Sequence, residues 1–185
     1  MLEKNSCELF SSGLKGAETA FGEMAAKYGV KSTVFTFDGH PAALSGGDNV
    51  VTLSDEDLGR GNISMEIVSK MMNRNYYQAE KIRKVLQVLF HAVNKGHQVF
   101  AVGAILEDNT VKGGTGWAVE LAKLFNRPLS VFDQDKGEWF SWKDGAWQQE
   151  APAISFTTFV GSGTRNLNEK GQKAIEDLFA KAFGS

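Results

Sequence analysis

The sequence VKGGTGWAVE, residues 111–120, contains the feature that decides the fold. A strand-like run, residues 98–102, precedes it, and a run with helical spacing, residues 117–125, follows it. Glycines at a strand-to-helix junction allow a tight turn and let a ligand approach the main chain. The N–H groups at the start of the helix, with the positive end of the helix dipole behind them, favour an anion. The stretch therefore predicts a turn that binds phosphate or another anion.

The same order of strand, glycine loop and helix occurs twice more. Residues 7–10 lead into residues 11–18, SSGLKGAE, and residues 156–160 lead into residues 161–166, GSGTRN. Loops that follow parallel strands emerge at the carboxyl edge of the sheet, where open α/β sheets bind ligands. The alternative is three ordinary turns that use glycine for geometry alone. We predict that the three loops gather along one edge and bind a phosphorylated small molecule.

The composition limits the classes of protein to which the chain can belong. Its 185 residues suit one domain, and a hydrophobic content of 42% can supply a core. The net charge of −2 and the absence of a Lys/Arg cluster disfavour nucleic-acid binding through a broad basic face. A small anion needs only one or two cations, so we expect a small ligand rather than DNA or RNA.

The sequence also carries expectations about compartment. Cys7 is the single cysteine, so no intramolecular disulfide can form, and a buried thiol is expected. No apolar run reaches membrane-spanning length, and residues 1–5 lack the basic and then apolar pattern of a signal peptide. We therefore expect a cytoplasmic protein without a membrane partner.

The order of the predicted elements indicates a single α/β domain, residues 1–185. An amphipathic helix at residues 17–28 is followed by a β-branched strand at residues 32–37, which makes a βαβ unit. Helical spacing covers residues 63–93 with one interruption, and the last helix begins near Asn168. We predict a Rossmann-like α/β fold with a mostly parallel sheet flanked by helices.

Residues 38–61 are the least regular part of the chain. A short strand is predicted at residues 50–53. A loop of this length inside a compact domain is usually functional or disordered. Asp48 and Asp55 are candidates to hydrogen-bond ribose hydroxyls, with a solvated loop as the alternative.

Residues 137–148 have a different, aromatic character. Trp139, Phe140, Trp142 and Trp147 flank an Asp-Gly pair, which is a hairpin signal between alternating aromatic residues. We predict an antiparallel hairpin appended to the parallel sheet. Its aromatic side chains are expected to pack on the sheet edge or on a partner subunit, with stacking on a base as the alternative.

The glycine loops resemble the SLOG superfamily, a Rossmann-like group that includes the lonely-guy phosphoribohydrolases and the DNA-processing protein A fold. The lonely-guy enzymes carry a Gly-Gly-x-Gly-Thr-x-x-Glu signature, which Gly113, Gly114, Gly116 and Glu120 match. Trp117 stands where the family has threonine, so the resemblance implies an altered phosphate pocket. The loop at residues 12–18 is similar to the first nucleotide-binding turn of the superfamily.

The resemblance extends over residues 7–183 and implies a role for one arginine. The family places an arginine in an Arg-Lys or Arg-Asn pair at the opening of the helix before the signature strand. Arg74, followed by Asn75, is the best match in this chain. The intervening helical region is longer here than in the lonely-guy enzymes, so Arg74 and Glu120 are not guaranteed to meet.

The first functional hypothesis is ligand capture without turnover. Some SLOG domains do no chemistry and sense nucleotide second messengers, including cyclic ADP-ribose-type signals in bacterial antiphage defence. The resemblance thus implies a protein that senses or sequesters ADP-ribose, a cyclic ADP-ribose-type signal or a nucleoside monophosphate, in antiphage-defence signalling or its inhibition. We favour this hypothesis because no catalytic set is recognisable, and we expect no cofactor.

The second hypothesis is a phosphoribohydrolase that cleaves the N-glycosidic bond of a nucleoside monophosphate. Glu120 would stabilise the oxocarbenium-like state or activate water, and Arg74 would hold the phosphate. The alternative for Glu120 is a first-turn residue that complements the helix dipole, and for Arg74 a solvated helix residue. A DNA-handling role, by analogy with the DNA-processing branch, is the third hypothesis, which the acidic balance disfavours.

The candidate ligand-binding residues combine main-chain N–H groups with charged and hydroxyl side chains. They are Ser11, Ser12, Gly13, Lys15, Gly16, Arg74, Lys112, Gly113, Gly114, Thr115, Gly116, Trp117, Glu120, Gly161, Gly163, Thr164 and Arg165. No metal site is expected, because the three histidines lack ligand spacing with each other or with the cysteine. By analogy with other SLOG proteins we expect a homodimer or a larger homo-oligomer.

Overall fold

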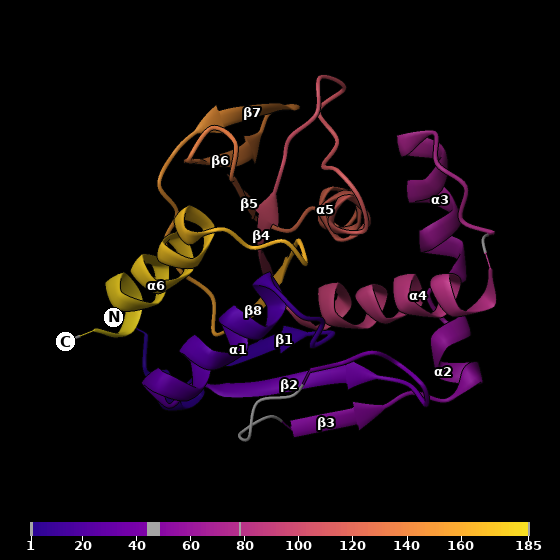
Figure 1. The fold of residues 1–185 in the computed structure, drawn as a ribbon, viewed down its shortest axis with the longest axis horizontal. Coiled ribbons are helices and arrows are strands. Elements are labelled where there is room, and N and C mark those ends of the chain that lie inside the picture. The colour runs from indigo at the N-terminus through magenta and orange to yellow at the C-terminus, as the bar shows by residue number, and fades with distance from the viewer. Residues whose placement is uncertain (1, 44–48, 78, 185) are drawn as a thin grey trace.

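The computed structural model describes residues 2–43, 49–77 and 79–184, and it contains one eight-stranded sheet (Figure 1). The strands are β1 (Glu8–Ser11), β2 (Lys31–Thr36), β3 (Asn49–Thr52), β4 (Gln98–Gly103), β5 (Leu129–Asp133), β6 (Glu138–Lys143), β7 (Ala146–Gln149) and β8 (Thr158–Gly163). The helices are the short 3-10 helix η1 (Lys4–Ser6), α1 (Ala17–Tyr28), α2 (Asp55–Gly59), α3 (Asn62–Met72), α4 (Glu80–Lys95), α5 (Thr115–Leu124) and α6 (Glu169–Phe183).

The order of the strands confirms the predicted α/β, Rossmann-like class. The order is β3-β2-β1-β8-β4-β5-β6-β7, in which the first six strands are parallel. The chain builds outward from β1 on one side and from β4 on the other, and β8 fills the position between them. Such a reversal of strand order leaves a crevice at the carboxyl ends of the strands, because the loops there diverge.

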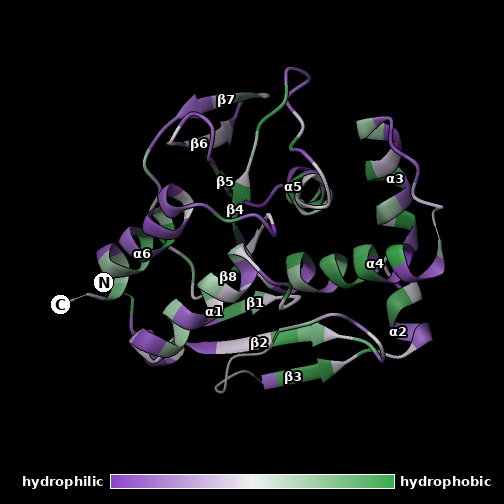
Figure 2. Ribbon diagram, viewed as in Figure 1, coloured by the Kyte–Doolittle hydropathy of each residue, from purple (hydrophilic) through white to green (hydrophobic). Residues whose placement is uncertain are grey.

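Alternating side chains divide the interior into two apolar layers. Leu9, Phe100 and Phe159 point to the face that α1 and α6 cover, whereas Phe10 and Val160 point to the face that α4 and α5 cover. Buried strands with both faces covered are nearly continuous in apolar residues. In Figure 2, α4 shows green alternating with white and purple, because only one side of this helix is apolar. In the described part of the chain, no helix is long and apolar enough to cross a membrane.

Several predicted boundaries move when the structure is compared with the sequence. The helical region predicted at residues 63–93 is two helices, α3 and α4, which pack against each other and against α5. The strand predicted at residues 50–53 is β3, the parallel edge strand beside β2. Asp55 opens α2 and forms an ion pair with Lys84, while Asp48 lies outside the described residues.

The third glycine segment differs from its prediction in a way that matters for the site. The sequence predicted that a strand ends at Val160 and that a loop begins at Gly161. The structure instead continues β8 through Gly163, in register with β4. A Cβ atom on Gly161 would lie 2.4 Å from Cγ of Phe21, so this glycine allows β8 to contact α1. Gly161 therefore serves packing and does not face a ligand.

The aromatic segment forms two antiparallel strands at the end of the sheet. β6 pairs with β5, and β7 pairs with β6 with Trp142 opposite Trp147. Asp144 and Gly145 both have positive φ in the turn between them. Trp139 packs on the α6 side, and Trp142 and Trp147 pack on the α5 side.

Candidate functional site

The three predicted loops contribute to one cleft at the carboxyl ends of the central strands. Its volume is about 530 Å³, which lies within the usual range for sites that bind small molecules. Loops after β1, β4, β5 and β8 line it together with one side of α4. The lining residues are Leu14, Glu18, Ile82, Val85, Leu86, Leu89, Gly103, Ala104, Lys112, Gly113, Gly114, Thr115, Gln134, Asp135, Ser162, Gly163, Thr164, Arg165 and Asn166.

The N-terminus of α5 presents main-chain donors to this cleft. Among the described residues, no group accepts a hydrogen bond from the N–H of Gly113, Gly114 or Thr115. A Cβ atom on Gly113 or Gly114 would meet no other atom within 4 Å, so both positions face open space. Three free N–H groups at the positive end of a helix dipole can hold an anionic oxygen.

Arg74 fixes the shape of this turn from the side away from the cleft. Its Nη1 donates to the carbonyl of Gly113 at 3.0 Å, and its Nη2 donates to the carbonyl of Val111 at 2.9 Å. The N–H of a planar trans peptide points opposite to its carbonyl. Binding the Gly113 carbonyl therefore turns the Gly114 N–H away from Arg74. Arg74 does not line the cleft, so it supports the loop and is not placed to contact a ligand.

Gly116 is required by the same arrangement. A Cβ atom on Gly116 would lie 2.1 Å from the carbonyl oxygen of Val111 and 2.5 Å from Nη1 of Arg74. The glycine therefore leaves room for the arginine and for the close turn, and it has no direct place in the cleft. This is a packing reason for a residue that the sequence assigned to ligand binding.

The first loop is occupied by a carboxylate of the protein itself. Glu18 is buried in the first turn of α1, where its carboxylate accepts hydrogen bonds from the hydroxyl of Ser12 at 2.6 Å and the N–H of Leu14 at 2.8 Å. The Ser162 hydroxyl of β8 donates to it at 3.4 Å. Burial raises the pKa of Glu18, and these hydrogen bonds partly oppose that effect. The first loop thus offers the ligand an acceptor rather than an anion cradle.

The other predicted residues of the first loop are structural or lie outside the cleft. Ser11 ends β1, and its hydroxyl accepts a hydrogen bond from the N–H of Gly13. Gly16 has a φ of 104°, and a Cβ there would lie 2.4 Å from the carbonyl oxygen of Thr164. This close approach joins the first and third loops. Lys15 is exposed and is not among the lining residues.

The third loop contributes cationic and polar groups. Gly163, Thr164 and Arg165 line the cleft, and the N–H of Thr164 donates to the Val102 carbonyl of β4. Burial, with the positive charges of Arg165 and Lys81, lowers the pKa of His40 to about 4. The charge of Arg165 therefore acts on the imidazole of His40.

Glu120 and Trp117 do not face the cleft. The carboxylate of Glu120 is buried against the ammonium of Lys123 at 2.9 Å, on the side of α5 that contacts the β6–β7 strands. The ring of Trp117 is buried beside Tyr76, 6.0 Å between centroids, in the layer between α5 and α3. Glu120 and Lys123 are three residues apart and therefore lie on the same side of α5. Within α5, only Thr115 at its start lines the cleft. The proposed pair of Glu120 and Arg74 is therefore not brought together there.

Sequence reasoning missed two parts of the cleft wall. The first is the apolar side of α4, formed by Ile82, Val85, Leu86 and Leu89. Their helical spacing indicates burial in a core and gives no sign that the layer opens to a ligand. The second is Glu18, which closes the quoted motif SSGLKGAE but acts through Ser162, 144 positions away. Only the folded chain reveals that contact.

Comparisons of the chain with models of protein families, with curated proteins and with solved structures found no match. In the described part of the chain, no group of three or more His, Cys, Asp and Glu side chains has an arrangement that could hold a metal ion. The case for a function therefore rests on the chemistry of the cleft itself.

Proposed function

We propose that this chain is a SLOG-type binding protein that captures or senses a phosphorylated, nucleotide-derived small molecule. The observation that carries the proposal is the opposition of two unlike walls in one cleft. Free N–H groups of Gly113, Gly114 and Thr115 form one wall, and the apolar side of α4 forms the other. A phosphate attached to a flat, apolar ring needs both kinds of surface.

The two walls divide the ligand between them. The phosphate lies against the start of α5, where Lys112 can add a charge-assisted hydrogen bond. The base lies against Ile82 and Val85 of α4, whose exposed apolar surface it removes from water. Glu18, which also lines the cleft, offers an acceptor to a ribose hydroxyl. ADP-ribose, a cyclic ADP-ribose-type signal and a nucleoside monophosphate all have this chemistry.

Capture rather than turnover fits the state of the acidic groups. Glu120, which a phosphoribohydrolase mechanism would require, forms a buried ion pair with Lys123. Arg74 uses its guanidinium on main-chain carbonyls. A general acid or base must reach the reacting atoms within hydrogen-bond distance. We therefore favour sensing or sequestration, in antiphage-defence signalling or its inhibition, over hydrolysis.

Two further parts of the proposal concern the setting of the protein. We propose a cytoplasmic location, where reducing conditions keep the buried thiol of Cys7 free. We also propose a homodimer or larger homo-oligomer, because α3 carries exposed apolar residues.

The decisive experiment is calorimetric titration of the purified protein, after denaturation and refolding to remove co-purified ligand, with ADP-ribose, cyclic ADP-ribose isomers and nucleoside monophosphates. Mass spectrometry of the molecules released on denaturation identifies a natural ligand directly. We expect at least one of these compounds to bind. Binding of none at high micromolar concentration overturns the proposal.

The variant Gly114→Leu tests the location of binding. Gly114 has ordinary helical φ and ψ and open space at its Cβ, so a leucine fits the backbone while its side chain enters the cleft. We expect binding to weaken by about tenfold or more, which is about 1.4 kcal/mol. Gly59→Leu on α2, remote from the cleft, is the matched control and should bind normally. Equal binding by both variants would place the ligand elsewhere.

A further inference from the structure

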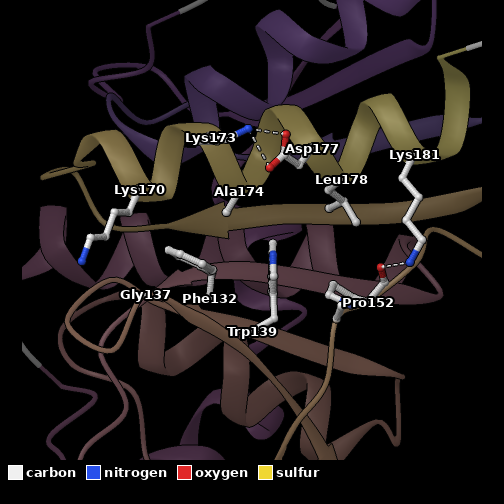
Figure 3. Close-up of a pocket in the computed structure, with 11 residues that line it drawn as sticks. Phe132, Gly137, Trp139, Pro152, Lys170, Lys173, Ala174, Asp177, Leu178 and Lys181 are labelled. Atoms are coloured by element: carbon white, nitrogen blue, oxygen red, sulfur yellow. Dashed lines mark hydrogen bonds and ion pairs between the residues drawn. The ribbon is translucent and has the colours of Figure 1, made fainter.

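A second cavity lies between α6 and the sheet, on the face that α1 and α6 cover. Its volume is about 400 Å³, and it shares no lining residue with the cleft. Phe132, Trp139, Ala174 and Leu178 supply apolar surface. Figure 3 shows these side chains between the helix and the strands, with lysines along the same stretch of α6.

Positive charge surrounds this apolar surface. Lys170, Lys173 and Lys181 all line the cavity, and Asp177 is the one acidic residue among the lining residues. Asp177 is bound to Lys173, with Nζ–O distances of 2.8 and 3.0 Å. Lys181 donates to the carbonyl of Pro152 at 3.2 Å and keeps two further donors. The cavity therefore has a positive balance that its own carboxylate does not neutralise.

Lys170 is available for a ligand. Among the described residues, no carboxylate or carbonyl accepts a hydrogen bond from its ammonium group. Figure 3 shows it beside Gly137, and its Nζ would lie 3.6 Å from a Cβ built on that glycine. An ammonium held near an apolar cavity without an anionic partner favours an anion that brings its own apolar body.

Trp139 supplies a second recognition element. Its ring packs edge-on against Phe132, 5.5 Å between centroids, and is only partly buried. In the described part of the chain, its indole N–H has no hydrogen-bond acceptor. Tryptophan side chains that contact ligands combine a large apolar face with one donor.

We propose that this cavity binds a small amphipathic carboxylate. Its aromatic or aliphatic body lies on Phe132, Trp139 and Leu178, and its carboxylate is bound by Lys170 at one end of the lysine row. A neutral molecule of the same shape would leave the ammonium groups unused. A nucleotide fits the cleft better, because the cleft provides the free N–H groups of Gly113, Gly114 and Thr115 for its phosphate and these groups do not line the cavity. The cavity is thus a second site with a different ligand class.

The test is calorimetric titration with 4-phenylbutyrate and with its neutral counterpart 4-phenylbutan-1-ol. We expect the carboxylate to bind in the millimolar range or tighter and the alcohol to bind at least about tenfold more weakly. Lys170→Gln should reduce carboxylate binding severalfold, whereas Lys95→Gln, an exposed lysine on α4, should not change it. Ala174→Phe should fill the cavity and abolish binding, with circular dichroism as the check on folding.

The cleft variant separates the two sites. Gly114→Leu should leave binding of 4-phenylbutyrate unchanged, because the cleft and the cavity share no residue. Any one of four results overturns the proposal: no binding of the carboxylate at about 5 mM, equal binding of the alcohol, unchanged carboxylate binding in Lys170→Gln, or loss of binding in Gly114→Leu. Lys170→Gln keeps the test decisive if Ala174→Phe does not fold.

Discussion

At the residue scale, the most informative group is the buried carboxylate of Glu18. It holds the first loop by accepting hydrogen bonds from Ser12 and Leu14, and it contacts Ser162 of β8. A single acidic side chain thus joins the first loop to strand β8, which is distant in sequence. The cost of this link is a carboxylate removed from water, which raises the pKa of Glu18 above its ordinary value.

Glu18→Gln should therefore change how stability depends on pH. An acid with a raised pKa binds its proton more tightly in the folded state, so wild-type stability falls as pH rises from about 4.5, the ordinary value, through the folded pKa. The variant lacks this loss. The free energy of unfolding of the variant minus that of the wild type should therefore rise over this pH interval and be constant above it. Urea unfolding followed by tryptophan fluorescence measures this. Glu23→Gln, exposed on the same helix, is the control.

A difference between Glu18→Gln and wild type that is constant across the pH range would contradict this account. It would mean that Glu18 has the same pKa in the folded and unfolded chains.

The residue types predicted the main-chain N–H donors of the cleft, at Gly113 and Gly114, better than its carboxylate acceptor, Glu18. Gly113 and Gly114 were identified because glycines at a strand-to-helix junction let a ligand approach the main chain, and both line the cleft with open space at their Cβ positions. Trp117, Glu120 and Gly161 were assigned to the site although they serve packing or pairing, since a motif does not say which side of a helix or strand a residue occupies. The side on which a residue lies depends on where the strand before it ends, and pairing with the neighbouring strands determines that position.

At the element scale, the β6–β7 strands are fastened to α5 by Lys123. Its ammonium pairs with Glu120 at 2.9 Å, donates to the carbonyl of Asn109 at 3.0 Å, and lies 3.9 Å from the centroid of the Trp142 ring. Trp147 donates to the same Asn109 carbonyl. These contacts join the end of the sheet to the loop between β4 and α5, so the aromatic strands support the wall of the cleft from behind.

Lys123→Met should destabilise the protein by about 3 kcal/mol or more, because it leaves the carboxylate of Glu120 buried without a partner. The double variant Glu120→Met/Lys123→Met should recover most of that loss, since no unpaired buried charge remains. Urea unfolding of the two single variants and the double variant gives the coupling energy. Additive losses would show that the pair is not coupled. Lys143→Met, whose ammonium pairs with Glu150 at the surface, should change stability little.

The ends of helices and strands were predicted where the local sequence determines them. They were missed where pairing within the sheet determines them. The cap of α6 at Asn168, whose side chain accepts from the N–H of Gly171, was predicted from the residue type alone. The extension of β8 to Gly163 was not, because its last residues pair with β4, more than fifty positions earlier. The interruption of the helical region was predicted near residues 73–75, and the structure confirms it, because α3 ends at Met72 and α4 begins at Glu80.

At the scale of the whole molecule, α3 presents an apolar stripe that nothing in the described chain covers. Ile63, Ile67 and Met71 recur every four residues and are 77%, 43% and 52% exposed. Ile82 of α4, 48% exposed, continues the surface to the rim of the cleft. The stripe therefore fits a second copy of this chain.

The protein should be a dimer in solution through this stripe, and Ile67→Glu should make it a monomer. A charge in the middle of the paired helices would be buried without a partner. Light scattering coupled to size-exclusion chromatography measures the mass of both. Phe156→Glu, which puts the same charge on an exposed apolar residue outside α3, is the matched control and should stay dimeric. A monomeric wild type would refute the prediction.

The position of β8 has a consequence for how the protein is made. This strand is synthesised after all the others, yet it occupies the middle of the sheet, between β1 and β4. A nascent chain that ends before Thr158 has two separate ribbons with open inner edges, which are prone to pair wrongly. The loops of both halves meet only when β8 is inserted between them. The cleft therefore forms only after β8 has joined the two halves of the sheet.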